Sequence, residues 1–124
     1  MEVFEAIAKR RSYRDGFKPT PVPREDLIKI VQAGLQAPSA CNAQTTRFMI
    51  VDDPKLLEQI GQMPTARQSL REAKALIACI VDRKPEPTYA DLAFQIEDCA
   101  AAVENMLLAI TALVAICALF YAAR

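Results

Sequence analysis

The sequence predicts an α+β fold, or the closely related α/β class, in which helices surround one small sheet. Residues 48–51 and 76–81 are short, continuous apolar runs, a pattern typical of strands that are buried on both faces. Stretches with helical periodicity or helix-capping residues precede, separate and follow these runs. The 124 residues, 52% of them hydrophobic and 24% charged, are enough for a single domain, residues 1–124, with a core of its own.

Two helices are predicted before the first strand. One covers about residues 2–10, and Asp15-Gly16 breaks it. Prolines at 19, 21 and 23 then favour extended chain, because each disfavours helix in the residue before it. The second helix begins near Arg24, and Pro38 stops it. The apolar face of the first helix comprises Val3, Phe4, Ile7 and Ala8, and the buried stripe of the second comprises Leu27, Ile28, Val31, Gly34 and Leu35.

The helices after the first strand have clearer boundary signals. Asp53 is a favourable N-cap, Pro54 suits the first helical position, and Gly61 closes the short helix that follows. A further helical piece is predicted over residues 65–73. From about Tyr89 onward the sequence contains no glycine or proline, which predicts one long helix toward the C-terminus. Because two strands alone make a poor sheet, we expect either that a partner chain completes it or that part of the domain is missing.

Composition excludes several classes of function. The formal net charge is zero, so the global charge gives no reason to expect nucleic-acid binding. The sequence has no histidine, which removes Ser-His-Asp catalysis and the commonest zinc ligand. The cysteines lack CxxC spacing, so we expect reduced thiols in a cytoplasmic protein and no metal site. They are Cys41, Cys79, Cys99 and Cys117.

A basic cluster follows the first helix, in the sequence Arg10-Arg11-Ser12-Tyr13-Arg14. Arginine presents a planar fork of donors that suits phosphate, and Ser12 adds a hydroxyl donor. Such a cluster could hold one anionic group. The alternative is that the positive charge merely stabilises the C-terminus of the helix, and the residues alone leave both interpretations open.

A loop of small and amide side chains, residues 37–44, joins the second helix to the first strand. Ser39, Asn42 and Gln44 could hydrogen-bond a planar heterocycle or a ribityl chain, and their small neighbours would let the backbone approach it closely. The alternative is an ordinary helix-to-strand connection with side-chain turns.

In this order, the RRSxR sequence at 10–14 and the PSxxNxQ sequence at 38–44 resemble the FMN-dependent nitroreductase family. The resemblance extends through the strand at 47–51 to a long helix at 93–113, and so covers nearly the whole chain. It implies the family's α+β fold, with helices around a small sheet and a long central helix at a homodimer interface. It also implies FMN as cofactor, NAD(P)H as electron donor and a small nitroaromatic or quinone-like molecule as acceptor.

The resemblance also implies which residues bind the cofactor. They are Arg10, Arg11, Ser12, Arg14, Pro38, Ser39 and Asn42. Arg10 and Ser12 would hold the FMN phosphate and ribityl chain, with Arg11 beside them. Arg14 would lie near the pyrimidine edge of the flavin, and the three loop residues would reach it from the other subunit. Arg67 and Gln68 are candidates for its N3/O4 edge. No catalytic side chain is implied, because the flavin carries the chemistry.

The chain departs from the family pattern in two places. Thr45-Thr46 stand where the family often has Pro-Trp. After the long helix the family usually has a turn and another strand, whereas here an apolar tail, residues 114–124, ends the sequence. We therefore expect that the C-terminal half of the family domain is absent through truncation or frameshift.

The tail also leaves alternatives to a flavin enzyme. Residues 106–123 carry no charge, and this uncharged stretch is just long enough for a membrane-spanning helix. Many of these residues are alanine, so we favour a core or dimer-interface helix over membrane anchorage. The alternatives are a non-catalytic dimeric remnant without flavin and, less favoured, a tail-anchored membrane protein.

Overall fold

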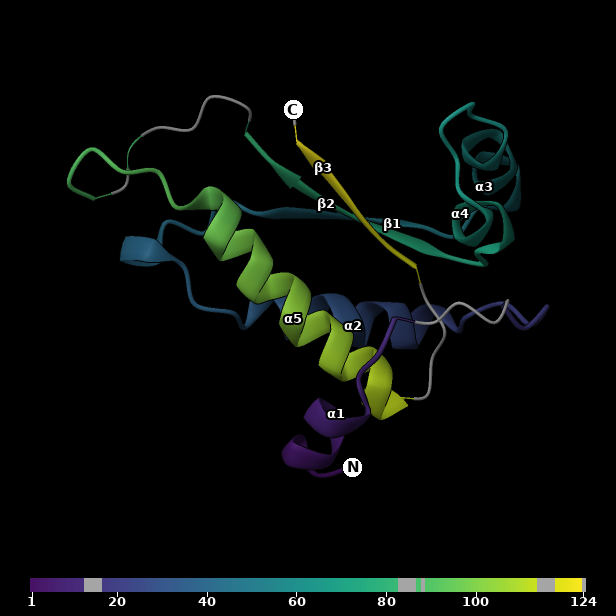
Figure 1. Cartoon of the computed structure of the whole chain (residues 1–124), viewed down its shortest axis with the longest axis horizontal. Coiled ribbons are helices and arrows are strands. Elements are labelled where there is room, and N and C mark those ends of the chain that lie inside the picture. The colour runs from purple at the N-terminus through teal and green to yellow at the C-terminus, as the bar shows by residue number, and fades with distance from the viewer. Residues whose placement is uncertain (13–16, 83–86, 88, 114–117, 124) are drawn as a thin grey trace.

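The computed structural model describes residues 1–12, 17–82, 87 and 89–113, together with the backbone of 118–123. Figure 1 shows a layer of strands above a layer formed by α2 (Arg24–Leu35) and the long helix α5 (Gln95–Leu113). Helix α1 (Val3–Lys9) packs against α5 on the side away from the sheet. The predicted α+β fold, with helices around a small sheet, is confirmed.

The sheet has three strands, in the order β1 (Arg47–Val51), β2 (Leu76–Val81) and β3 (Ala118–Ala123). β1 pairs with β2 in antiparallel fashion, whereas β3 pairs with β2 in parallel, with Ile77 as the partner of Leu119. The central strand β2 is buried along most of its length, as predicted. β1 lies at the edge of the sheet, and Met49 is 49% exposed, so the prediction that this strand is buried on both faces was wrong.

Residues 118–123 of the C-terminal tail form a strand, and the prediction that the long helix continues through them was wrong. Helix α5 ends at Leu113, and β3 begins at Ala118. The tail contains the sequence Leu119-Phe120-Tyr121, in which aromatic residues favour strands, and the backbone of β2 offers it a row of hydrogen-bonding groups. Within the part of the chain that the structure describes, no helix is both long and apolar enough to cross a bilayer.

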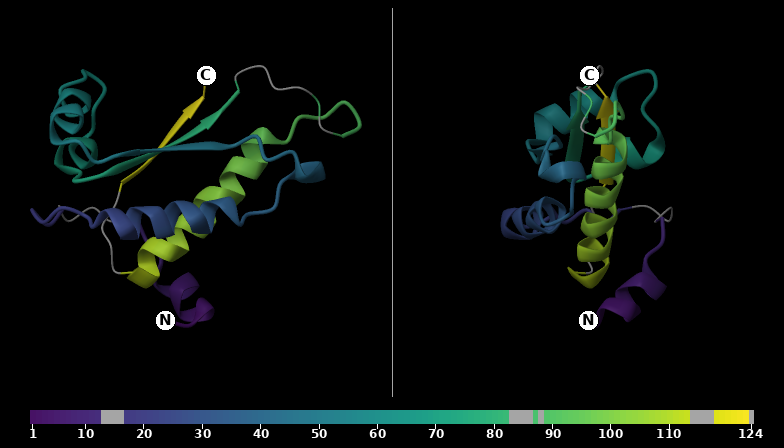
Figure 2. Two further views of the ribbon diagram at one scale, coloured as in Figure 1. Left: turned by 180° about the vertical axis from the view of Figure 1, so that it is seen from behind. Right: turned by 90° about the vertical axis from the view of Figure 1, so that its left-hand side faces the viewer.

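The short helices around the sheet follow their sequence signals to different degrees. Helix α3 (Pro54–Gly61) has the predicted bounds, and the Leu56 N–H donates a 2.8 Å hydrogen bond to Asp53 Oδ1 at its N-terminus. Helix α4 (Gln68–Glu72) is shorter than the predicted 65–73. Both helices lie at the same end of the sheet in Figures 1 and 2.

The long helix begins later than predicted, at Gln95 rather than near Tyr89. Tyr89 and Leu92 instead exchange two backbone hydrogen bonds, of 3.3 and 2.8 Å. Ala90 and Asp91, between them, have φ angles of 47° and 62°. This left-handed turn is incompatible with a continuous α-helix, and glycine-free sequence alone did not reveal it.

The core lies between β2 and the two long helices. Its fully buried side chains include Ile30 of α2 and Met106 of α5. On α2, Leu27 and Gly34 of the predicted stripe are buried as predicted. Ile28 and Leu35 are instead 44% and 60% exposed, and Ile30, which was not predicted, is buried. The predicted apolar face of α1 is likewise exposed, and only Ala6 of that helix is buried within the chain.

Two cysteines join the sheet to the helix layer. Cys79 of β2 and Cys99 of α5 are both fully buried in the core, and their side chains contact each other. Burial, together with a smaller contribution from the neighbouring Cys99, raises the pKa of the Cys79 thiol to about 12. Both thiols are therefore held in the neutral form. Cys41 is an exposed free thiol, and the side chain of Cys117 lies outside the described residues.

Candidate functional site

The loop between α2 and β1 has an unusual backbone. It contains the short helix η1 (Ala40–Asn42), and three of its residues, Cys41, Asn42 and Gln44, have φ angles of 51°, 55° and 53°. This left-handed region is disfavoured for residues with a Cβ atom, although asparagine tolerates it better than most. Strained backbone of this kind persists where surrounding contacts hold it, and it is common at ligand-binding sites.

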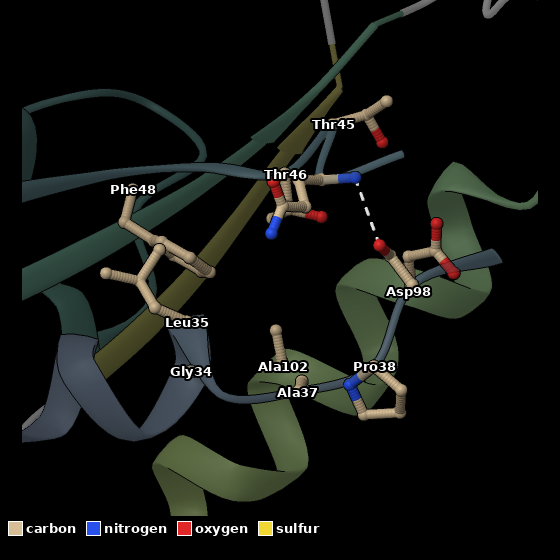
Figure 3. A pocket seen from close by; sticks show the side chains of 11 residues that line it. Gly34, Leu35, Ala37, Pro38, Thr45, Thr46, Phe48, Asp98 and Ala102 are labelled. Carbon is tan, nitrogen blue, oxygen red and sulfur yellow. Dashed lines mark hydrogen bonds between the residues drawn. The ribbon is translucent and has the colours of Figure 1, made fainter. Parts of the chain in front are cut away.

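Two hydrogen bonds hold the loop in this shape. Inside the loop, the Gln44 N–H donates to Ser39 Oγ at 3.0 Å, the contact drawn as a dashed line in Figure 3. From outside, Asp98 of α5 accepts a 2.9 Å hydrogen bond from the Ala40 N–H through its Oδ1. The hydroxyl of Ser39 therefore serves a side-chain turn, and the loop is also attached to the long helix.

A cavity of about 300 Å³ lies between this loop, the start of β1 and the N-terminal half of α5. Figure 3 shows Leu35 and Phe48 on one side of it, with Pro38 and Asp98 on the other. Its lining combines apolar residues with hydroxyl, amide and carboxylate groups. The lining residues are Gly34, Leu35, Ala37, Pro38, Ser39, Gln44, Thr45, Thr46, Phe48, Asp98 and Ala102.

Three polar residues of this wall were not predicted as site residues. Thr45 and Thr46 follow the predicted loop motif, and Asp98 lies in the first turn of α5. The Thr45 hydroxyl oxygen is buried and has no hydrogen-bond partner among the described residues. An acidic residue in the first turn of a helix is commonly explained by the helix dipole, so no sequence pattern indicated that Asp98 would contact residue 40.

The predicted basic cluster lies elsewhere in the chain. Arg10 follows the last turn of α1, and its Nε lies 3.9 Å from Glu104 Oε1 of α5. Arg11 and Ser12 are exposed to solvent. Arg14 lies outside the described residues. The structure therefore presents two arginine side chains and one hydroxyl on a surface beside α5.

Within one chain, the two predicted halves of the site remain separate. Glu104, which contacts Arg10, and Asp98, which holds the loop, are six residues apart on α5, roughly 9 Å along the axis and on different faces of the helix. Of the predicted loop residues, Pro38 and Ser39 line the cavity, whereas Asn42 is exposed. Arg67 and Gln68 belong to the α3–α4 end of the sheet, opposite the loop in Figure 2.

This α+β chain has two polar surfaces, and both contact the long helix α5. One surface is basic, and the other consists of the strained loop beside the cavity. A family model described as "Nitroreductase family" matches residues 7–75, which include the end of α1, the whole of α2, the loop and β1. This match covers more than half of the sequence. The chain belongs to the nitroreductase family.

Individual relatives agree with this assignment. A protein of Archaeoglobus fulgidus, provisionally named an NADH dehydrogenase/NAD(P)H nitroreductase, is 36% identical over 108 residues, which are 87% of this chain. An FMN-dependent nitroreductase of Clostridium difficile is 31% identical and superimposes with a TM-score of 0.72 over 89% of this chain. A nitroreductase with bound FMN from Bacteroides fragilis is 27% identical, with a TM-score of 0.74 over 91% of this chain.

The chain spans only part of each of these proteins. The matched region is 60% of the Archaeoglobus protein, 61% of the Clostridium chain and 66% of the Bacteroides chain. The residues matched by the family model, 7–75, contain the basic cluster and the strained loop. What these complete proteins bind or act on is therefore only a guide to the function of this chain.

Proposed function

We propose that this protein is an FMN-dependent oxidoreductase that takes a hydride from NAD(P)H and passes it to a nitroaromatic or quinone-like acceptor. The observation that carries the proposal is its membership of the nitroreductase family, together with the shared fold of solved relatives that are named as FMN-bound or FMN-dependent. Bound FMN would supply the two-electron chemistry. The side chains of this protein would bind and orient it.

The donor groups at the basic surface suit the FMN phosphate. Arg11 and Ser12 are exposed, and the 3.9 Å contact between Arg10 and Glu104 leaves that guanidinium available to a stronger partner. Guanidinium groups and a hydroxyl form short, charge-assisted hydrogen bonds to phosphate oxygens. The loop residues Pro38 and Ser39 line the cavity and, with the exposed Asn42, offer a proline ring and polar groups that suit the flavin ring and ribityl chain.

We further propose that the enzyme works as a cytoplasmic homodimer in which the two surfaces of the site come from different subunits. Arg10 and the strained loop contact α5 on different faces, which favours a site that a second subunit completes. Helix α1 also exposes an apolar face, with Phe4 82% and Ile7 54% exposed. Contiguous apolar surface of this kind is typical of protein interfaces.

The first experiment is a visible absorbance spectrum of the purified protein, recorded alone and after FMN is added and the free cofactor is removed. Retained flavin bands, followed by NAD(P)H oxidation that depends on a quinone or nitroaromatic acceptor, would support the proposal. A colourless protein that FMN does not reconstitute would refute it. That outcome would favour the alternative of a non-catalytic dimer, which size-exclusion chromatography with light scattering would identify.

A further inference from the structure

The carboxylate of Asp98 attaches the strained loop to the long helix. Asp98 Oδ1 accepts a 2.9 Å hydrogen bond from the Ala40 N–H, across 58 positions of sequence. Asp98 also lines the cavity, beside Pro38 and Ser39. The contact is partly buried, so water competes with it less than at an exposed position.

The loop needs such an attachment to keep its shape. Cys41, Asn42 and Gln44 all have positive φ angles, and none of them is a glycine. Without external contacts, residues of this kind relax toward the ordinary right-handed or extended regions. The internal hydrogen bond between Gln44 and Ser39 spans the loop but does not join it to the rest of the fold. The contact to Asp98 does join it, immediately before the strained residues.

We propose that Asp98 is a positioning residue for the cofactor. Asp98 fixes the loop of residues 37–44 on α5. Pro38, Ser39 and Asn42 are therefore already in their binding arrangement before FMN arrives. This inference rests on the proposed FMN-binding function. A ligand that binds a pre-ordered loop avoids the entropic cost of ordering it, and so binds more tightly.

The test compares three variants of the whole protein by FMN titration, followed through quenching of flavin fluorescence. Asp98→Ala removes the acceptor and should weaken FMN binding by about three- to tenfold, because the loss of this partly buried loop contact reaches the cofactor only indirectly and so costs about as much as an ordinary hydrogen bond. Asp98→Asn keeps an oxygen acceptor in the same place and should retain most of the affinity. Glu97→Ala is the matched control, because it removes a neighbouring exposed acid from the same first turn of α5 and should leave the affinity unchanged.

A second readout separates loop order from general stability. Hydrogen exchange of the Ala40 amide, measured by NMR without FMN, should speed up in Asp98→Ala while the amides of β2 and the melting temperature stay near their original values. Alanine is a strong helix former, so the substitution should not disturb α5 itself. Faster Ala40 exchange together with weaker FMN binding, both restored in Asp98→Asn, would support the inference.

The possible failures can be told apart. If the unmodified protein binds FMN and Asp98→Ala binds it equally well, Asp98 has no positioning role, although the proposed function stands. Equal losses in Asp98→Ala and Glu97→Ala would also overturn the inference, because the effect would then be one of helix charge. If the unmodified protein does not bind FMN at all, both the proposed function and this inference are wrong.

Discussion

Gly34 of α2 packs directly against Met106 of α5. A Cβ atom added at Gly34 would lie 2.9 Å from Met106 Cγ and 3.1 Å from its Sδ. Met106 is fully buried, so its side chain has little free space into which to move. The absence of a side chain at position 34 therefore sets how α2 packs on α5, and it also shapes one wall of the cavity.

Adding a methyl group at this contact should destabilise the protein. We expect Gly34→Ala to lower the free energy of unfolding by about 1 kcal/mol, because an overpacking cost of about 1–3 kcal/mol outweighs a gain in helix propensity of about 1 kcal/mol. Urea denaturation followed by circular dichroism measures the change. The comparison is a double-mutant cycle with Met106→Ala, in which Gly34→Ala should become neutral or stabilising. An unchanged cost in that background would contradict the steric explanation.

Removing the guanidinium of Arg10 should weaken FMN binding. We expect Arg10→Ala to cost about 1.5–3 kcal/mol of binding free energy, the usual contribution of a charge-assisted hydrogen bond. Lys9→Ala is the matched control, since it removes the same charge from the adjacent residue, whose ammonium group is already paired with Glu5. Isothermal titration with FMN distinguishes the two. Equal affinities of the two variants would show that the phosphate is held by other residues.

The buried thiol of Cys79 should make stability depend on alkaline pH. Its pKa is raised in the folded protein to about 12, whereas an unfolded thiol ionises near pH 8.5. Between these values the unfolded state binds fewer protons, so the free energy of unfolding should fall with rising pH, by up to about 1.4 kcal/mol per pH unit. Below about pH 8 this group should contribute no pH dependence.

Cysteine variants provide the comparison for this effect. The slope above pH 9 should become shallower in Cys79→Ala and stay the same in Cys41→Ala, whose thiol is exposed. Denaturant titrations from pH 7 to 10.5 give the slopes directly. An identical slope in all three proteins would mean that other groups, such as tyrosines, govern the alkaline range.

The N-cap of α3 should contribute measurably to stability. Asp53 Oδ1 accepts the Leu56 N–H at 2.8 Å, so we expect Asp53→Ala to lower the free energy of unfolding by about 0.5–2 kcal/mol. Asp53→Asn retains a capping oxygen and should restore most of the loss. Thermal melts of the three proteins at neutral pH test this, and an Asn variant as unstable as the Ala variant would indicate a role of charge rather than of the hydrogen bond.

Several features of this protein could be predicted from sequence because their causes are local. The cap at Asp53, the proline at the first position of α3 and the apolar run of β2 act within a few residues, and the structure has each of them where predicted. The ordered pair of motifs at 10–14 and 38–44 also sufficed to indicate the family. The identity of the cofactor-binding residues stays a prediction.

The tertiary structure decided what depends on contacts between distant residues. The tail becomes a strand because β2 offers it a parallel edge, a partner that hydrophobicity along the tail does not reveal. β1 is half-exposed because it lies at the edge of the sheet, although its sequence resembles that of a central strand. Asp98 meets Ala40 only because α5 packs beside the loop. Local sequence thus determined the elements and their caps, whereas packing between distant elements determined strand pairing, burial and the shape of the cavity.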